Sequence, residues 1–301
     1  MSARRDHNWR GYLFVAPAAV YLAIFTLLPI AAAAYMSLHR WHLLKPQRPF
    51  VGWGNFATLL GDPFFREAIV NTLVFVAISV PLGVASALAV ALLVSRPLRG
   101  VGFFRTLFYT PSVCSQVALS MLWIWILMPA AGAHEGGLLA FLLGRLGFPV
   151  TRNVLADPWG AMLALAALMA WIGVGPRMII FVAGLQSIPH ELHEAAALDG
   201  AGPWQKVRHV TLPLLLPTTL FVFVTTTIAA FQFFTPVYVI TRGGPRRSTD
   251  VLMYHIYREA WQKFEAGMAS AQSFVLFALI LIAALLQLRL MRRGLHVGDV
   301  A

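Results

Sequence analysis

The chain has 301 residues, of which 59% are hydrophobic and only 12% are charged, and its mean hydropathy is +0.72. Soluble domains carry roughly 25% charged residues, so this composition excludes an ordinary water-soluble protein and indicates a surface that largely faces lipid. The net charge of +11 does not indicate nucleic-acid binding, because Lys and Arg lie almost wholly between apolar runs, where they hold loops against lipid headgroups.

Six apolar segments are long enough to cross a membrane, which takes roughly 20 residues. They predict membrane-spanning helices at residues 11–38, 68–94, 104–129, 159–185, 212–240 and 268–291. Most contain prolines and small residues, which bundled membrane helices tolerate. The predicted fold class is therefore all-α, an integral membrane bundle of six helices.

The first segment follows Arg4, Arg5 and Arg10, as the apolar part of a signal peptide would. Its apolar run is much longer than the 7–15 residues of a signal peptide, so we interpret it as a retained first helix with its N-terminus inside. Lys and Arg divide evenly between the two sides of the membrane, so charge alone does not settle the orientation. The single cysteine, Cys114, cannot form an intrachain disulfide, and we interpret it as an inert packing residue.

The inner loop at residues 186–211 is polar, with an acidic centre, and predicts a short helix. Pro189 suits a first helical turn, residues 190–199 contain no helix breaker, and Gly200 with Gly202-Pro203 ends the pattern. Taken alone, such a helix is typical of a connector lying on the membrane surface. Its alanine face also allows close approach of a partner protein.

The spacing within this loop resembles the cytoplasmic signature of bacterial binding-protein-dependent ABC importers. Glu194-Ala195-Ala196 is followed at the family's spacing by Gly200 and then by Val210-Thr211-Leu212-Pro213, with Val210 where the family usually has Ile. The resemblance covers nearly the whole chain and is to the carbohydrate-uptake branch, in particular to the first, maltose- or glycerol-phosphate-type permease subunit. Further matching strings are Leu13-Phe14-Val15-Ala16-Pro17-Ala18, Phe50-Val51-Gly52, Asn71-Thr72-Leu73, Phe104-Arg105, Ala183-Gly184-Leu185-Gln186-Ser187-Ile188-Pro189 and Thr241-Arg242-Gly243-Gly244-Pro245.

The resemblance implies the fold of type I importers and a bacterial inner-membrane location with both termini cytoplasmic. The expected division is a cytoplasmic tail (1–10), a first helix with an outer loop (11–67), a core (68–291) containing the coupling loop (186–211), and a second cytoplasmic tail (292–301). In the family, this loop docks on the ATPase subunit. The residues expected to couple the chain to the ATPase are Glu194, Ala195, Ala196, Asp199 and Gly200.

The implied partners are a second permease subunit, two ATPase subunits, an extracytoplasmic binding protein and the sugar. The sequence contains no G-x-x-x-x-G-K-[ST] loop, so we expect ATP and Mg²⁺ to bind the partner ATPases and no cofactor to bind this chain. We also expect no enzymatic activity, catalytic residue or metal ligand. His193 lies three positions after His190, whereas the zinc-protease motif places its second histidine four positions after the first, and no G-x-S-x-G motif is present.

A secondary transporter or channel without an ATPase is the alternative reading. Such proteins usually carry acidic residues inside the membrane for ion coupling. None of the six predicted spans contains Asp or Glu, which disfavours this alternative.

Two segments are candidates for the substrate pathway. Arg177 is the only charged residue well inside a predicted span, roughly 16 Å before the loop at Ile188. It either faces a cavity or has a structural partner. In the fifth span an amide lies among aromatic residues, which suits a sugar but is also typical of packing. The family resemblance implies a sugar site built from Trp171-Ile172-Gly173 and Phe231-Gln232, with Met169 in place of the usual Asn. The identity of the sugar, and whether it is anionic, stay open.

Overall fold

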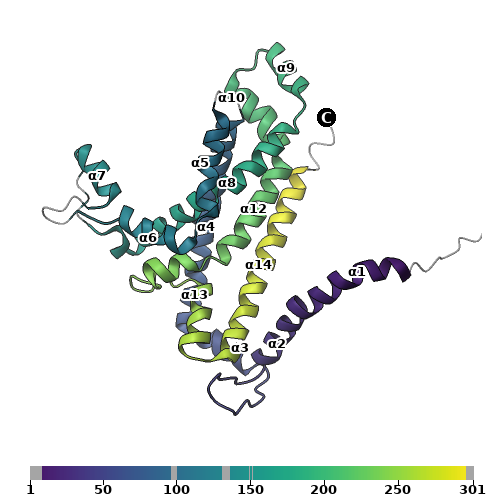
Figure 1. The fold of residues 1–301 in the computed structure, drawn as a ribbon, viewed down its shortest axis with the longest axis vertical. Helices are drawn as coiled ribbons and strands as arrows, with labels where there is room; N and C mark the ends of the chain where they lie inside the picture. Colours follow the sequence, from purple (N-terminus) through teal and green to yellow (C-terminus); the bar gives the residue numbers. More distant parts are fainter. Residues whose placement is uncertain (1–8, 96–99, 131–135, 149, 151, 296–301) are drawn as a thin grey trace, which may run out of the picture. The chain divides into compact units, whose positions relative to one another are not determined.

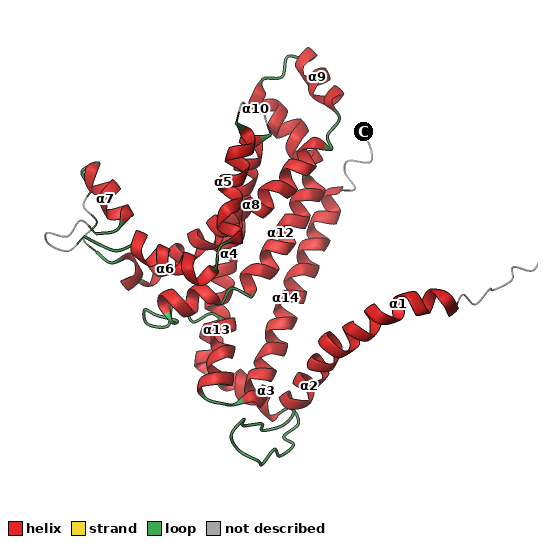
Figure 2. Ribbon diagram, viewed as in Figure 1, coloured by secondary structure: helices red, strands yellow, loops and turns green. Residues whose placement is uncertain are grey.

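The computed structural model describes residues 9–95, 100–130, 136–148, 150 and 152–295, and within these residues it confirms the all-α prediction (Figures 1 and 2). The α-helices are α1 (Trp9–Leu22), α2 (Leu28–Ser37), α3 (Gly54–Gly61), α4 (Pro63–Val94), α5 (Val101–Val113), α6 (Gln116–Ile126), α7 (Leu138–Arg145), α8 (Pro158–Gln186), α9 (His190–Leu198), α10 (Pro203–Lys206), α11 (Leu212–Leu214), α12 (Leu216–Phe231), α13 (Leu252–Tyr257) and α14 (Ala266–Leu295). Shorter π or 3₁₀ turns are η1 (Ala23–Leu27), η2 (Val154–Ala156), η3 (Val207–Thr211), η4 (Val237–Thr241) and η5 (Arg258–Gln262).

The chain divides into two compact units, residues 1–62 with 256–275 and residues 63–255 with 276–301. In the first unit the helical run Tyr12–Ser37 has an apolar stretch with no buried residue, so its surface is available to lipid or to another protein. Asn55 anchors the end of this run because its Nδ2 donates hydrogen bonds to the carbonyl oxygens of Ser37 (2.7 Å) and His39 (2.9 Å). Gly267 approaches the same turn, and its N–H donates to the carbonyl oxygen of Trp41 at 2.9 Å.

The core of the second unit lies where α4 packs along α8, with α5 and α12 beside them (Figure 1). Gly83, Ala87 and Ala91 recur every four residues on α4 and are buried, which allows close approach of the helix backbones. Gly175 of α8 packs directly on α5, because a Cβ added there would lie 2.6 Å from the carbonyl oxygen of Phe108.

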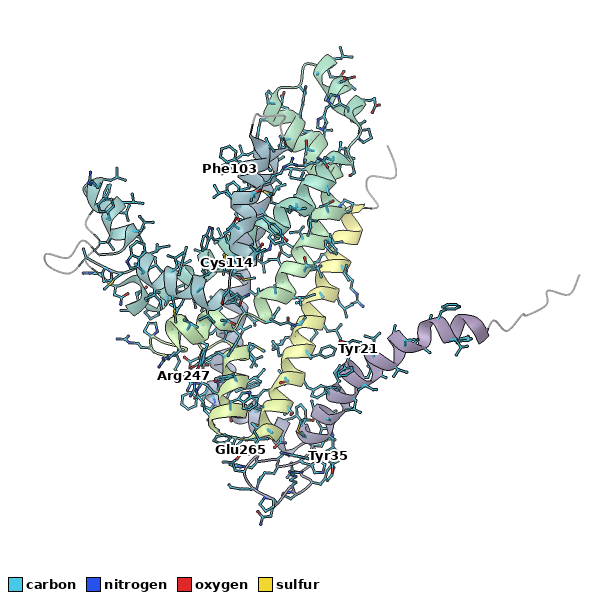
Figure 3. All side chains as sticks on the ribbon, in the orientation of Figure 1. Tyr21, Tyr35, Phe103, Cys114, Arg247 and Glu265 are labelled. Carbon is cyan, nitrogen blue, oxygen red and sulfur yellow. The ribbon has the colours of Figure 1, made fainter. Side chains whose placement is uncertain are left out.

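Two predicted spans are bent. Among the described residues four helical runs are long and apolar enough to cross a membrane, at 12–37, 63–94, 158–186 and 266–290, and the number rises to six if each bent pair is one span. The predicted span 104–129 is broken by 104° between α5 and α6, where Pro111 precedes an extended Cys114. Cys114 is exposed at this break and is not the packing residue that we expected (Figure 3).

The predicted span 212–240 is bent by 69° at Leu215, between Pro213 and Pro217, and its long helix ends at Phe231. Proline removes a backbone donor and clashes with the preceding turn, which makes both bends possible, although α4 and α8 stay unbroken at Pro81 and Pro176. In contrast, the helix expected at residues 190–199 is present as α9 (His190–Leu198).

Candidate functional site

A cavity of about 220 Å³ lies within the second unit, where α8 passes the end of α12. The residues that line it are Gln116, Met169, Ile172, Gly173, Arg177, Ala229, Gln232, Phe233, Phe234 and Thr235. The cavity therefore combines two amides, aromatic rings, a hydroxyl group and one arginine. Its volume is below the roughly 300–1,000 Å³ typical of drug-sized ligand sites, which suits one ring or one charged group at a time.

The end of α12 forms one wall of this cavity. The helix stops at Phe231, and Gln232 follows as its C-cap. The rings of Phe233 and Phe75 stack with centroids 5.0 Å apart, and those of Phe234 and Tyr238 stack at 5.7 Å. The rings of Phe233 and Phe234 are held by this stacking. Gln232 beside them is exposed, and its amide lines the cavity.

Arg177 of α8 forms another part of the wall. Its guanidinium lies between two glycines: a Cβ added to Gly83 of α4 would be 2.7 Å from Nη1, and one added to Gly173 would be 2.6 Å from Nη1. Nη1 is buried without a hydrogen-bond partner among the described residues. The close approach of α4 and α8 therefore holds the Arg177 guanidinium beside the cavity. Neither helix provides a counter-ion for it there.

The structure brings together four of the six residues expected along the substrate pathway, namely Ile172, Gly173, Arg177 and Gln232. The other two lie in packed positions. Trp171 stacks on Trp123 at 5.7 Å, and Phe231 is 2% exposed and does not line the cavity. Their contact with cargo stays a prediction.

Residues that sequence reasoning did not select also line the cavity, in particular Gln116, Phe233 and Thr235. Phe233 and Thr235 belong to the same aromatic stretch of sequence as Gln232. This stretch could therefore have indicated the whole cavity wall at the end of α12. Gln116 carried no signal, because only the break between α5 and α6 brings it to this place.

The expected coupling residues lie on and beside α9, just beyond the end of α8 (Figure 1). The helix has no buried residue, and Leu198 at its end is 90% exposed. Glu194 contacts only His190 among the described residues, with Oε1 and Nδ1 3.2 Å apart, and both side chains are exposed. Gly200 has φ +81°, a left-handed conformation that favours glycine and ends the helix. Ala195 and Asp199 are also exposed, and Ala196 is half-buried.

A second cavity of about 350 Å³ lies beneath α9. Its lining comes from the ends of α4 and α8, from His193 of α9 and from Lys206 and the η3 turn. Within α9 only His193 lines this cavity and no residue is buried, so the helix is not packed onto the bundle along its length.

The motifs Asn71-Thr72 and Thr241–Pro245 both contact residues 247–252, and in the second motif the carbonyl oxygen of Gly244 accepts from Thr249 Oγ1 at 2.6 Å. Asn71 Nδ2 donates to the carbonyl oxygen of Arg247 at 2.8 Å, and Thr72 Oγ1 accepts from the backbone N–H of Leu252 at 2.7 Å. Asp250 is buried, and its Oδ2 accepts from Arg247 Nη2 at 2.8 Å. These contacts tie the glycine-containing turn to the start of α4. No group of three or more His, Cys, Asp or Glu in the described part of the chain could hold a metal ion.

The long apolar helices, the polar cavity between them and the unpacked helix at their end define a multi-pass membrane protein of the transport class. Residues 79–294 match the family described as "Binding-protein-dependent transport system inner membrane component", and the chain belongs to this family. Its relatives are permease components of transport systems, which is consistent with a subunit that catalyses no reaction itself.

Relatives match nearly the full length of the chain. It is 34% identical to the probable ABC transporter permease protein YurN of Bacillus subtilis (94% of this chain, 96% of that protein). It is 33% identical to the sn-glycerol-3-phosphate transport system permease protein UgpA of Agrobacterium fabrum (95% and 96%). It is 35% identical to the lactose transport system permease protein LacF of Rhizobium radiobacter (95% of each).

The fold is that of solved ABC importers. The crystal structure of a bacterial ABC transporter involved in the import of the acidic polysaccharide alginate matches with a TM-score of 0.80 and 23% identity over 96% of each chain. A second structure of the bacterial alginate transporter, in complex with an alginate pentasaccharide-bound periplasmic protein, matches with a TM-score of 0.81. These matches confirm the predicted type I permease architecture.

Proposed function

We propose that this chain is the first of two transmembrane subunits of an ATP-driven importer for a sugar or a related carbohydrate. The observation that carries the proposal is a polar cavity midway along α8, in the same unit as the exposed helix α9 just beyond the end of α8. Aromatic rings pack on sugar C–H groups, and an amide both donates to and accepts from hydroxyl groups. The relatives' named cargoes are sn-glycerol-3-phosphate and lactose, so the proposal specifies a carbohydrate class and not one compound.

We further propose four partners for the chain: a second permease subunit of similar fold, two ATPase subunits that bind ATP and Mg²⁺, and an extracytoplasmic binding protein. The alginate transporter solved with its periplasmic protein supports the binding-protein partner. The Glu194-Ala195-Ala196 surface of α9, open to contact, supports ATPase docking. This assignment gives an inner-membrane protein with both termini and α9 in the cytoplasm.

The geometry suggests how ATP-driven motion would reach the cargo. The connections of α9 lead directly into α8 on one side and, through α10 and η3, toward α12 on the other. These two helices carry Arg177 and Gln232, which line the 220 Å³ cavity. Movement of α9 with a closing ATPase would therefore shift both cavity walls and alternate access between the two sides of the membrane.

Reconstitution in liposomes tests the proposal against a secondary transporter or channel. We expect radiolabelled carbohydrate uptake only when the partner permease, the ATPases, the binding protein and internal ATP are all present. Uptake by this chain alone, driven by a proton or sodium gradient, would contradict the proposal. Replacing ATP by a non-hydrolysable analogue provides the matched control.

A further inference from the structure

Arg177 is a cation for which the described part of the chain supplies no counter-ion. No hydrogen bond or ion pair joins it to another described residue, and Nη1 is buried without a partner. The cavity beside it is lined by amide, hydroxyl, aromatic and aliphatic groups but by no carboxylate. An arginine inside a membrane span is costly unless it is paired, so the site has capacity for an anion.

The position of the guanidinium argues against the two structural roles that an intramembrane arginine usually has. A snorkelling arginine extends along the helix toward the lipid headgroups. Arg177 instead lies against Gly83 on α4 and Gly173 one turn earlier on α8, because a Cβ at either glycine would come within 2.7 Å of Nη1. An arginine that caps a neighbouring helix would donate to a carbonyl oxygen, and none among the described residues accepts from Arg177.

We infer that this cavity receives a carboxylate or phosphate group carried by the cargo, and that Arg177 makes the permease select acidic over neutral carbohydrates. The inference rests on the proposed function and narrows its substrate class. A guanidinium binds carboxylate and phosphate through two parallel N–H donors, an arrangement that a lysine cannot copy. Gln232, in the same cavity, would then bind a hydroxyl group of the same compound.

Paired acidic and neutral probes test the inference on the detergent-purified complex with its ATPase subunits. Thermal stabilisation is measured with sodium glucuronate against glucose and with glycerol 3-phosphate against glycerol, and uptake of the same probes is measured after reconstitution with the binding protein. For wild type we expect stabilisation by at least one acidic probe and not by its neutral partner. Arg177→Gln should weaken binding of that probe at least tenfold, and Arg177→Lys should weaken it less.

Arg105→Gln is the matched control. Arg105 is also a basic residue of a membrane helix, but its Nη2 donates to the carbonyl oxygen of Val94 at 3.0 Å and it does not line this cavity. We expect this variant to keep the wild-type preference for the acidic probe. If Arg177→Gln does not assemble, Gly83→Ala is tested in its place. Gly83 does not line the cavity, and a Cβ added there keeps the positive charge of Arg177 but displaces its Nη1. An unchanged acidic preference in Gly83→Ala would then overturn the inference.

The two measurements separate failure of this inference from failure of the proposed function. Uptake of neutral carbohydrate with no stabilisation by any acidic probe, or equal acidic stabilisation in wild type and Arg177→Gln, overturns the inference and leaves the importer intact. Acidic stabilisation that depends on Arg177, without ATP-driven uptake of any carbohydrate, supports the anion site and contradicts the importer. Absence of both uptake and acidic stabilisation overturns both.

Discussion

Gln232 illustrates how the end of a helix can place an amide beside a cavity. Its backbone caps α12, while its side chain faces the cavity and forms no hydrogen bond with another described residue. The family resemblance selected this residue, because its aromatic neighbours alone are also typical of packing. It did not predict Gln116, because no pattern within residues 104–129 reveals that the chain turns by 104° and carries this second amide to the same cavity.

We expect Gln232→Leu to raise the half-saturating cargo concentration about 5- to 150-fold. An unpaired hydroxyl group facing leucine would lose about 1–3 kcal/mol, which gives this range. Uptake kinetics in proteoliposomes measure the effect, with assembly checked by size-exclusion chromatography. Gln262→Leu, an exposed position outside the cavity, is the control. Equal kinetics for the two variants would remove Gln232 from the substrate pathway.

Asp250 has a structural role that the sequence did not indicate. It is 1% exposed, and its Oδ2 contacts Arg247 Nη2 at 2.8 Å and His255 Nδ1 at 3.2 Å. We expect Asp250→Asn to destabilise the chain by about 1.5–3 kcal/mol, the range for a hydrogen bond to a charged group. Asp157→Asn serves as the comparison, because Asp157 is an exposed N-cap of α8 and asparagine caps a helix about as well, so we expect almost no loss of stability there. Melting temperatures that rank the variants in the reverse order would contradict this role.

At the scale of elements, α9 was predictable and the two bends were not. Pro189 and Gly200 mark the ends of α9 through local backbone chemistry, so the sequence was sufficient. Pro111 and Pro217 were visible too, but membrane helices tolerate proline in straight and broken forms alike. Which form occurs depends on packing between distant helices, and a single sequence does not contain that information in readable form.

We expect Glu194→Lys to reduce both transport and co-purification of the ATPase at least tenfold. Reversing an exposed charge in a docking surface places like charges together, while the Glu194–His190 contact is too exposed for its loss to unfold the helix. Glu191→Lys is a matched control on the same helix, outside the Glu-Ala-Ala motif. Gly200→Val tests the turn, because a β-branched residue is strained at φ +81°. Wild-type transport and ATPase retention in both Glu194→Lys and Gly200→Val would contradict the coupling role.

At the scale of the whole molecule, the sequence predicted the all-α class and the approximate positions of the four long apolar helices, while the other two predicted spans are bent helix pairs in the described part of the chain. Apolar runs of about 20 residues are a direct consequence of bilayer thickness, so they can be recognised in the sequence whatever the details of helix packing. The cavity is different, since its lining comes from α6, α8, the end of α12 and the segment after α12. Some of its residues could be named from the family resemblance. That these residues come together, and that Trp171 and Phe231 do not line the cavity, is visible only in the three-dimensional structure.

Orientation in the membrane is the remaining whole-molecule property, and cysteine labelling tests it. With Cys114 replaced by Ser, we expect a cysteine at position 197 on α9 to react only from the cytoplasmic side, and one in the loop at residues 130–158 to react only from outside. Gly144 is the better site in that loop, because added atoms there meet no neighbour within 4 Å, whereas a Cβ at Gly137 would overlap the carbonyl oxygen of Trp125. A membrane-impermeant maleimide applied to intact spheroplasts and to inverted vesicles distinguishes the two sides. Because Cys114 is itself exposed at the α5–α6 break, it has to be replaced, and the cysteine-free Cys114→Ser parent provides the background signal. Labelling of position 197 from outside would place α9 away from any cytoplasmic ATPase and would contradict the proposed coupling, whatever the transport activity of the variants.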